Sequence, residues 1–480
     1  MGERASHRVT GKIIIRATIT NTSPILIGKG PGDAADIEMM LLPDGKPYIP
    51  ASSLAGGLRS QFYKRISPPL SDDEKIQAEK FWGSDDSKQA VTFQSHIRFN
   101  DLTPLESTDS ARKIVTRDGV KISYSTGTAE EGAKYDYQLT EAGVSWGLEA
   151  EVTIRNGMSP DSFKFFTGII NAMLADQDFR IGAFSNTGFG AIECTGLEAG
   201  YFDFTQDDHR SKWFEYLETG SLPDGLDAGY EPKDIRKYGP STFRIEADFR
   251  IKGALILGSY GISPEEPDKS HLKTSMDNTI KPVLTGKSIK GALRHRAVRI
   301  LNTLGIPDAE KRLESLMGWV ETDRQGNNPN ACKSRLRMEE VIIDEVEEKL
   351  VQNRIRINRF TGGTMNGALF NSEPVWAKEA KKHVTIILTL PDYADWEATL
   401  LLQLLKDLWT GDLPIGGEKN IGRGVLTGEA ATILFKDGTV TFKRNGEKGE
   451  LAFTTGDIKD LAPFNISIKE QIAITKTSTI

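Results

Sequence analysis

The chain has 480 residues, and a usual domain size of roughly 100 to 200 residues predicts about two to four domains. Hydrophobic residues make up 38% and charged residues 26%, and no stretch approaches the roughly 18 consecutive apolar residues of a membrane helix, so the composition indicates a globular protein. The net charge of -7 argues against a surface coated with non-specific nucleic-acid contacts, so an RNA or DNA site would be a local basic strip.

The N-terminal half predicts an alternation of strands and helices. A strand-like segment, GKIIIRATI from Gly11, ends at a glycine turn at Gly28. A variable loop follows, and then a helix that begins near Ser53. VTIRNG from Val152 predicts a strand, and SFKFFTGIINAMLAD from Ser162 predicts a helix. A glycine-rich loop and the strand-like GAIECTGL close this half of the chain.

The C-terminal half shows the same order of elements. TFRIEADFRI from Thr242 predicts a strand that ends at Gly258, and a helix begins near Ser288 after a second variable loop. HVTIILTLP from His383 predicts a strand, and ADWEATLLLQLLKDL from Ala394 predicts a helix, before a glycine-rich loop and the strand-like RGVLTGEA. The order strand, helix, strands, helix, strand is that of a ferredoxin-like α+β domain, in which helices cover one face of a sheet.

The two halves also match in sequence at a nearly constant offset. PYIPASSLAGGLRS from Pro47 aligns with PVLTGKSIKGALRH from Pro282, 235 positions later. ISYSTGTAEEGAKYD and INRFTGGTMNGALFN keep that offset, and IGAFSNTGFG and IGGEKNIGRG lie 234 positions apart. These matches predict an internal duplication with two homologous domains, residues 1–235 and 240–480, which we call the first and second repeats. The seam falls within residues 219–241, where Gly, Pro and Asp cluster.

Several kinds of site are excluded by the residues present. Only Cys194 and Cys332 occur, so a disulfide framework and a four-cysteine zinc site cannot form, and the start of the chain lacks a secretory signal, so we expect a cytoplasmic protein. The six histidines show no paired spacing of metal ligands, and no nucleophile elbow is present. GKS at residues 286–288 lacks the earlier glycine that a phosphate-binding P-loop needs.

The duplicated helices share the pattern Ser-x-x-Gly-x-x-Arg. Its residues are Ser53, Gly56 and Arg59 in the first repeat and Ser288, Gly291 and Arg294 in the second. One interpretation is a capped helix whose glycine packs closely against the sheet. The other is a phosphate cradle made of the free N–H groups at the helix start and the guanidinium.

Glycine-rich loops and basic hairpins are the other candidate contacts for a polynucleotide. Glycines allow close backbone approach, and Lys419 and Arg423 favour that use of the second closing loop, whereas tight turns are the alternative explanation. TGTAEEGA and TGGTMNGA predict projecting hairpins flanked by basic residues. Two equivalent basic projections favour repeated engagement of a repeating polymer, although solvated hairpins have the same composition.

The acidic residues of the two variable loops are the catalytic candidates. The first loop, GPGDAADIEMM, contains Asp33 and Asp36, and the second, SPEEPDKSHLKTSMD, contains Asp268 and Asp277. Acidic loops are commonly solvated, so residue chemistry alone does not choose among these carboxylates.

Taken together, these segments resemble the RAMP superfamily of CRISPR-associated proteins. The resemblance rests on the glycine-ended first strand, the acidic loop, PYIPASSLAGGLRS with PVLTGKSIKGALRH, the segment NRFTGGTMNGALFNSEPV and the NIGRG loop, in one order and over most of the sequence. More narrowly, the chain is similar to backbone subunits of type III effector complexes, with two such subunits fused in one chain as in type III-D-like systems.

The resemblance implies two tandem ferredoxin-like, RRM-related domains whose hairpins are thumbs that interrupt a guide–target duplex. The implied partners are a guide crRNA, a target RNA, a large polymerase-like subunit, other RAMP subunits and a small subunit, with no membrane. One loop aspartate per domain would serve RNA-guided cleavage of the target. This implies Asp36, with Asp33 as the fallback, and Asp268, with Asp277 as the fallback, in a second loop that is five residues longer.

When the protein supplies no nucleophile, the ribose 2′-OH of the RNA serves as the attacking group. One carboxylate would then accept a proton or hold a hydrated Mg²⁺ or Mn²⁺ ion. A purely architectural guide-RNA-binding subunit is the alternative, and guide-RNA processing lacks an evident histidine or tyrosine acid–base site. The candidate RNA-binding residues are Ser53, Gly56, Arg59, Arg117, Lys121, Thr126, Ser288, Lys290, Arg294, Arg356, Arg359, Thr361, Lys419 and Arg423.

Overall fold

The computed structural model shows a chain that separates into two compact units. The described residues are 8–66, 69–84, 93–105, 113–123, 126–176, 178–226, 241–260, 266–276, 279–321, 330–347, 350–378, 382–445, 450–455, 461, 464 and 467–477. Unit 1 comprises Met1–Thr116, Asp136–Ser185 and Phe189–Gly239, and unit 2 comprises Arg117–Tyr135, Asn186–Gly188 and Pro240–Ile480. The predicted division between residues 235 and 240 lies outside the described residues.

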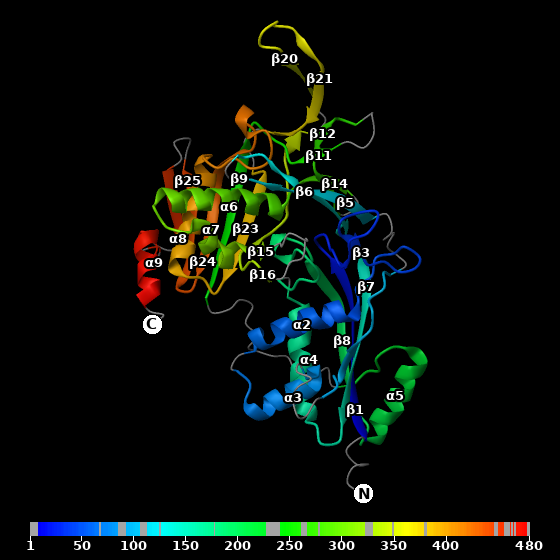
Figure 1. Cartoon of the computed structure of the whole chain (residues 1–480). Helices are drawn as coiled ribbons and strands as arrows, with labels where there is room; N and C mark the ends of the chain where they lie inside the picture. Colours follow the sequence, from blue (N-terminus) through cyan, green and yellow to red (C-terminus); the bar gives the residue numbers. More distant parts are fainter. Residues whose placement is uncertain are drawn as a thin grey trace. The chain divides into compact units, whose positions relative to one another are not determined.

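Unit 1 contains a four-stranded antiparallel sheet with the strand order β4-β7-β1-β8 (Figure 1). Its elements are β1 (Val9–Asn21), β2 (Gly28–Gly30), β3 (Glu38–Met39), α2 (Ala51–Arg65), α3 (Asp72–Trp82), β4 (Ile97–Phe99), β7 (Ser145–Arg155), α4 (Pro160–Leu174), β8 (Ile192–Asp203) and α5 (Asp207–Thr219). The chain order β1, α2, β4, β7, α4, β8 with this strand order is that of a ferredoxin-like domain, which confirms the expected fold class.

The alternation of side chains along β1 divides the unit 1 core between two faces of the sheet. Ile13, Ile15 and Ile19 are buried in one cluster with side chains of α2 and α4. Ile14 points to the other face, where it packs with Phe202 of β8 and with α5. Helix α5 therefore adds a cover on the second sheet face, outside the ferredoxin-like order.

Unit 2 contains a six-stranded sheet with the order β17-β23-β9-β24-β25-β26. Its elements are β9 (Thr242–Lys252), β10 (Ala254–Leu255), β11 (Gly258–Tyr260), β12 (Lys269–His271), β13 (Lys273–Met276), β14 (Thr279–Leu284), α6 (Gly286–Thr303), α7 (Ala309–Met317), β15 (Trp319–Glu321), β16 (Asn330–Cys332), β17 (Arg337–Met338), β18 (Val341–Ile342), β19 (Val346–Glu347), β20 (Gln352–Ile357), β21 (Thr364–Glu373), β22 (Val375–Ala377), β23 (Val384–Pro391), α8 (Asp395–Thr410), η3 (Lys419–Ile421), β24 (Val425–Phe435), β25 (Gly438–Asn445), β26 (Glu450–Thr455) and α9 (Ile468–Thr477). The order β9, α6, β17, β23, α8, β24 repeats the ferredoxin-like arrangement, and β25 and β26 extend one edge. No helix of the described part combines the length and apolar character that a membrane crossing requires.

Both predicted hairpins form. In the first repeat β5 (Ile114–Ile122) pairs with β6 (Ala129–Thr140), and residues 117–135 of this hairpin belong to unit 2. In the second repeat β20 pairs with β21, and the two strands extend away from the rest of unit 2 (Figure 1). Strand β12 runs parallel to the base of β21, so the loop before β12 is tied to the hairpin.

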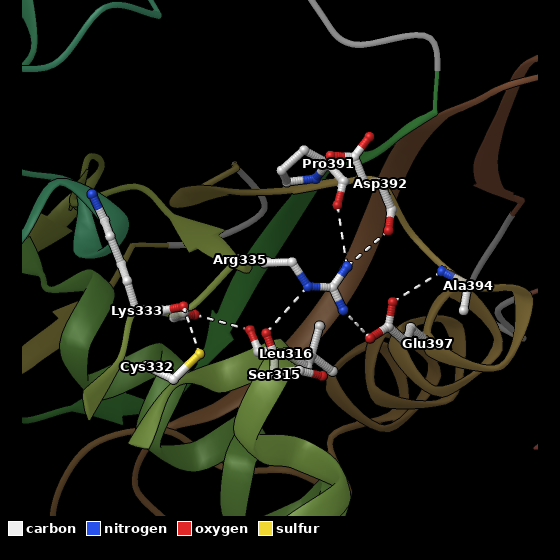
Figure 2. A network of polar contacts seen from close by, with 10 residues as sticks. Ser315, Leu316, Cys332, Lys333, Arg335, Pro391, Asp392, Ala394 and Glu397 are labelled. Carbon is white, nitrogen blue, oxygen red and sulfur yellow. Dashed lines mark hydrogen bonds and ion pairs between the residues drawn. The ribbon is translucent and has the colours of Figure 1, made fainter. Parts of the chain in front are cut away.

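A guanidinium joins three elements of unit 2 (Figure 2). Arg335 donates to the carbonyl of Ser315 in α7 at 3.2 Å and to the carbonyl of Asp392 after β23 at 2.8 Å, and it forms an ion pair with Glu397 in α8. The Glu397 side chain is 2% exposed, and its other oxygen accepts the N–H of Ala394 at 2.9 Å. This network fixes the start of α8 against α7 and β23.

We expect Glu397→Ala to lower the free energy of unfolding by about 2 to 3 kcal/mol, because it leaves Arg335 and the Ala394 N–H without their acceptor. Arg335 is partly exposed, so the loss should be smaller than for a fully buried ion pair. Urea denaturation followed by circular dichroism measures the change. The control Glu310→Ala, at an exposed position of α7, should stay within about 0.5 kcal/mol of the parent. Equal effects of the two substitutions would contradict the role of the network.

Candidate nucleic-acid interface

In the first repeat, Asp36 is tied to the hairpin by two reciprocal hydrogen bonds. The N–H of Asp36 donates to the carboxylate of Asp136 in β6 at 2.7 Å, and the N–H of Asp136 donates to the carboxylate of Asp36 at 2.9 Å. Ile37 forms a parallel bridge with Tyr137 next to this pair. Asp36 is exposed. The loop aspartate is therefore held at the base of the hairpin with one carboxylate oxygen left for another partner.

The second repeat builds the same arrangement from Asp268. The N–H of Asp268 donates to the side-chain oxygen of Asn371 in β21 at 2.7 Å, and the N–H of Asn371 donates to the carboxylate of Asp268 at 2.8 Å. Lys269 pairs in parallel with Ser372, as Ile37 does with Tyr137. Asp136 and Asn371 lie 235 positions apart. Asp36 and Asp268 are thus structurally equivalent, although their loops differ in length. We call this pair of hydrogen bonds the aspartate clasp.

The fallback aspartates differ from the clasped residues. Asp33 is exposed in the same loop as Asp36 and has no ion pair or side-chain hydrogen bond to any other described residue. Asp277 lies outside the described residues. Glu38 shapes the first loop: its carboxylate pairs with Lys29 at 2.6 Å and accepts the N–H of Ala34 at 2.7 Å. These contacts, Lys29 first, lower the pKa of Glu38 below its ordinary value. Within the described ranges, no three His, Cys, Asp or Glu side chains gather as metal ligands.

The arginine of the Ser-x-x-Gly-x-x-Arg pattern contacts the end of the next helix in both repeats. Arg59 donates to the carbonyl of Gly83, which follows α3, at 2.7 Å. Arg294 donates to the carbonyl of Gly318, which follows α7, at 2.8 Å. Carbonyls at a helix C-terminus lack intrahelical partners and carry partial negative charge, so each guanidinium stabilises that end. Stabilisation of this helix end explains why both repeats have an arginine at this position.

The glycine of the pattern does not pack against the sheet, so that interpretation is wrong. Gly56 and Gly291 are exposed, and a methyl group added to either would meet nothing within 4 Å. The serine lies within the first helical turn: Ser288 donates its N–H to Thr285, which is the N-cap of α6, and α2 starts after Pro50 with Ser53 inside it. Both glycines leave a bare backbone face that internal packing does not explain.

The first hairpin uses its charged residues internally. Arg117 is 3% exposed, pairs with Glu340 at 2.8 Å and donates to Thr274 at 2.9 Å, all within unit 2. Lys121 pairs with Glu130 across the hairpin at 2.7 Å. Thr126, in the turn, exchanges a hydrogen bond with Thr128 at 2.8 Å. Of these predicted contacts, the exposed Lys121 and Thr126 remain accessible to a ligand, whereas Arg117 is covered.

The second hairpin presents unpaired cations and an aromatic ring at its tip. Arg356 and Arg359 are exposed and have no ion pair with any described residue. Thr361 accepts the N–H of Gly363 at 3.3 Å in the turn. Phe360, between Arg359 and Thr361, is 100% exposed. A free ring beside guanidinium groups is able to stack on a base while the cations contact phosphates.

The closing glycine-rich loops differ in chemistry between the repeats. Arg423 is 4% exposed and pairs with Glu418 at 2.6 Å, and burial lowers its pKa. Arg354 joins the same glutamate at 2.9 Å. At the equivalent position of the first repeat Phe184 replaces Glu418 with nearly the same positive φ, and its ring packs on the buried Phe189. Arg423 is thus an internal partner, and the exposed Lys419 remains accessible.

Lys290 was predicted to contact RNA, but its side chain is buried. Its ammonium donates to the carbonyl of Leu336 at 2.9 Å and to the hydroxyl of Ser334. The ammonium is enclosed by the segment between β16 and β17, so burial, together with Arg294 and Lys333, lowers the pKa of Lys290 to about 7.

A cavity of about 590 Å³ in unit 2 gathers basic side chains. His295, Arg296 and Arg299 of α6 line it together with Lys419, and Asp412 is the acidic residue of the lining. Arg296 is paired with Asp407 at 2.7 Å, and burial lowers the pKa values of His295 and Lys419. Arg299 is exposed. Cations from two separate segments around one open cavity favour an anionic ligand such as an RNA phosphate.

The fold and these surfaces define a tandem pair of RRM-related α+β domains, each with a hairpin and a clasped aspartate. The family model of the RAMP superfamily matches residues 18–193 and 242–427. The chain therefore belongs to the RAMP superfamily, and its two matched segments are two tandem RAMP domains. This membership supports the predicted association with CRISPR systems and with RNA. No curated protein matches the chain.

Sequence reasoning did not find several residues of this interface. Asp136 and Asn371 were not singled out, although the 235-position offset aligns them as polar residues at the end of the hairpin motif. Phe360 replaces Ser125 in that alignment, which marks an aromatic residue at a solvated turn. Arg299 lies one helical turn beyond His295, and only the folded loop beside it shows that both line a cavity.

We expect Gly56→Ala and Gly291→Ala to raise the free energy of unfolding by about 0.5 to 1 kcal/mol each, because alanine favours the helix and its methyl group meets no neighbour. If RNA lies on this bare face, the same substitutions will weaken RNA affinity, measured by fluorescence anisotropy, by about threefold or more. Gly57→Ala, whose methyl group faces Phe179, is the control and should leave RNA affinity unchanged. Unchanged affinity in all three variants would show that RNA does not contact the face.

Proposed function

We propose that the chain is a backbone subunit of a type III CRISPR effector complex that binds guide RNA and cuts complementary target RNA at one aspartate-dependent site per repeat. The observation that carries this proposal is the aspartate clasp, which recurs around Asp36 and Asp268 with matching hydrogen bonds. A carboxylate kept exposed at the same place in both repeats, at the base of a hairpin, is suited to act on a strand that the hairpin bends.

RNA binding would use the surfaces that remain open in each unit. In unit 2 these are the hairpin tip with Arg359 and Phe360 and the basic cavity beside Lys419. In unit 1 the bare helix face at Gly56 is available. Cationic groups would hold the phosphates, and an exposed ring would stack on a base without selecting a sequence. Such contacts suit a protein whose sequence specificity comes from guide–target base pairing.

The proposed cleavage is an internal transfer within the target strand. The 2′-oxygen attacks the adjacent phosphorus, the bond from phosphorus to the 5′-oxygen breaks, and a 2′,3′-cyclic phosphate and a 5′-hydroxyl result. The attack requires the 2′-oxygen, phosphorus and 5′-oxygen to align, which A-form RNA does not permit without distortion. The hairpin would displace a nucleotide to create that alignment. Asp36 or Asp268 would accept the 2′-hydroxyl proton, and a water molecule would protonate the departing 5′-oxygen.

A divalent cation fits the donor set only as a hydrated ion. Asp36 and Asp136 supply two carboxylates in the first repeat, whereas Asp268 stands beside the amide of Asn371 in the second. Mg²⁺ in phosphoryl-transfer sites commonly takes one or two carboxylates and completes its shell with water and phosphate oxygens. When bound, Mg²⁺ or Mn²⁺ would stabilise negative charge on the phosphate. The first repeat is expected to hold the ion more tightly.

A second candidate function is a structural, non-cleaving subunit of the same complex. The clasp favours it in one respect, because the hydrogen bonds give each aspartate a role in fixing the loop to the hairpin. In either case the proposed partners are a guide crRNA, a target RNA and the other effector subunits: a large polymerase-like subunit, further RAMP subunits and a small subunit. The two functions differ in whether the carboxylate charge is needed after assembly.

We expect Asp36→Asn and Asp268→Asn each to remove one cut in a bound target RNA, with the rate at that position falling at least about 100-fold. Asparagine keeps a side-chain oxygen for the clasp, so guide-RNA binding and assembly should be unchanged. End-labelled target RNA resolved on a sequencing gel measures each cut separately.

Asp33→Asn, on the same loop but outside the clasp, is the matched control and should leave every cut intact. Retention of all cuts by both clasp variants, with normal assembly, would reject the catalytic proposal and favour the structural subunit. Loss of the first repeat's cut from Asp33→Asn, with that cut kept by Asp36→Asn, would move the first site to Asp33.

A further inference from the structure

Unit 1 contains a cavity that the two-domain plan does not require. It has a volume of about 310 Å³ and lies between the first turns of α2, the end of α3 and β4. Ala55 and Gly56 of α2, Trp82 of α3 and Phe99 of β4 line it, with Arg59 and Ser95 among the polar lining groups. A volume of roughly 300 Å³ or more is in the range of small-ligand sites. All of these residues belong to unit 1.

The second repeat fills the equivalent space with its own side chain. Lys290 lies 235 positions after Ala55, and its ammonium reaches Ser334 and the carbonyl of Leu336. Matching hydrogen bonds support this comparison. Ser95 donates to the carbonyls of Phe81 and Ile97, and Ser334 donates to those of Leu316 and Leu336. The two repeats therefore share this site, but only the first leaves it open.

The first repeat also has a different wall at this site. The rings of Trp82 and Phe99 stack with their centroids 6.5 Å apart and their planes 18° apart. In the second repeat methionines, Met317 and Met338, occupy the corresponding positions. The first repeat thus combines an open cavity with aromatic side chains, whereas the second combines a cavity filled by Lys290 with flexible methionine side chains.

A polar group at the aromatic wall lacks a partner. Trp82 is 5% exposed, and its Nε1 has no hydrogen-bond acceptor among the described residues. A buried N–H without an acceptor destabilises the fold, and a ligand that brings an acceptor to it removes that cost. Ser95 uses its hydroxyl hydrogen on the carbonyls of Phe81 and Ile97, but its oxygen retains lone pairs that accept a hydrogen bond. The Arg59 guanidinium, which donates to the carbonyl of Gly83, is the charged group of the lining.

The lining favours a neutral, flat ring over a positively charged group. Arg59 already places one cation in the lining, which disfavours a second positive charge beside it. Aromatic rings and small residues offer apolar contact to a planar face, while the donors meet a polar edge. A nucleobase has both features, and bases are commonly read in this way when they leave a strand's stack.

We propose that this cavity binds one unpaired nucleobase of the RNA held by the first repeat, and that the second repeat cannot do so because Lys290 fills the site. The inference rests on the proposed RNA-binding function. It predicts an asymmetry between otherwise equivalent repeats: one nucleotide position of the bound strand has its base enclosed beside Trp82. The base is held through its face and edge, so phosphate contacts elsewhere still supply most of the affinity.

The test exchanges the filling residue between the repeats. Full-length chain is loaded with RNA that carries 4-thiouridine at one position at a time, irradiated, and digested, and cross-linked peptides are identified by mass spectrometry. In the parent, one position should cross-link to the peptide that contains Trp82. Ala55→Lys, which copies the second repeat, should reduce that cross-link at least tenfold while total RNA retention on a filter changes less than threefold.

Lys290→Ala is the reciprocal variant and should create a new cross-link to the peptide that contains Met317. Urea denaturation of each variant verifies that the fold is kept. RNA retention with no cross-link at Trp82, or a cross-link that Ala55→Lys leaves unchanged, would overturn the base site alone. Weakened binding of another subunit by Ala55→Lys, without an RNA cross-link, would assign the cavity to a protein side chain instead. Failure of the parent to retain any RNA would overturn the proposed function as well.

Discussion

The aspartate clasp is the constraint on which the proposed chemistry depends. Two hydrogen bonds join the loop before β3 to β6 in the first repeat, and the same two join the loop before β12 to β21 in the second. A loop would otherwise let its carboxylate explore many orientations, and catalysis by a single group needs one orientation. Because the clasp uses the backbone N–H of both residues, it positions the aspartate through the hairpin that would bend the RNA.

Around this shared feature the two repeats have diverged in ways that keep the shape and change the chemistry. The closing loop places Phe184 and Phe189 where the second repeat has Glu418 and Arg423, so a ring contact and an ion pair hold the same turn. At the clasp, Asn371 replaces Asp136 and removes one negative charge. A duplicated scaffold is free to vary at such positions when each substitution satisfies its own neighbours. The repeats are therefore related domains whose candidate sites differ in chemistry.

The sequence allowed the fold to be predicted because the duplication shows twice where apolar alternation and glycine turns fall. The order of strands and helices follows from those patterns. Asp36 and Asp268, the two loop aspartates chosen from the sequence, both form the clasp despite the unequal loops, and their catalytic role stays a prediction. Roles that depend on burial were not predictable. Arg117 and Lys290 are cations of the kind that bind phosphate, yet Arg117 forms a buried ion pair with Glu340, and Lys290 donates a hydrogen bond to Ser334. Linear spacing places a cation on a helix or strand, but it does not show which acidic or polar group comes from elsewhere in the fold to meet it.

The most direct measurement is an experimental structure of the chain in its effector complex with guide RNA and a target that carries 2′-deoxynucleotides at the cut positions, which blocks the attack. We expect one displaced nucleotide beside each hairpin. One clasped carboxylate, Asp36 or Asp268, should face the 2′-carbon of the adjoining sugar, at a distance of about 3 Å from where the 2′-oxygen would lie or connected to that place through one water. Both carboxylates pointing into solvent away from any phosphate, with the strand undistorted at the hairpins, would contradict it.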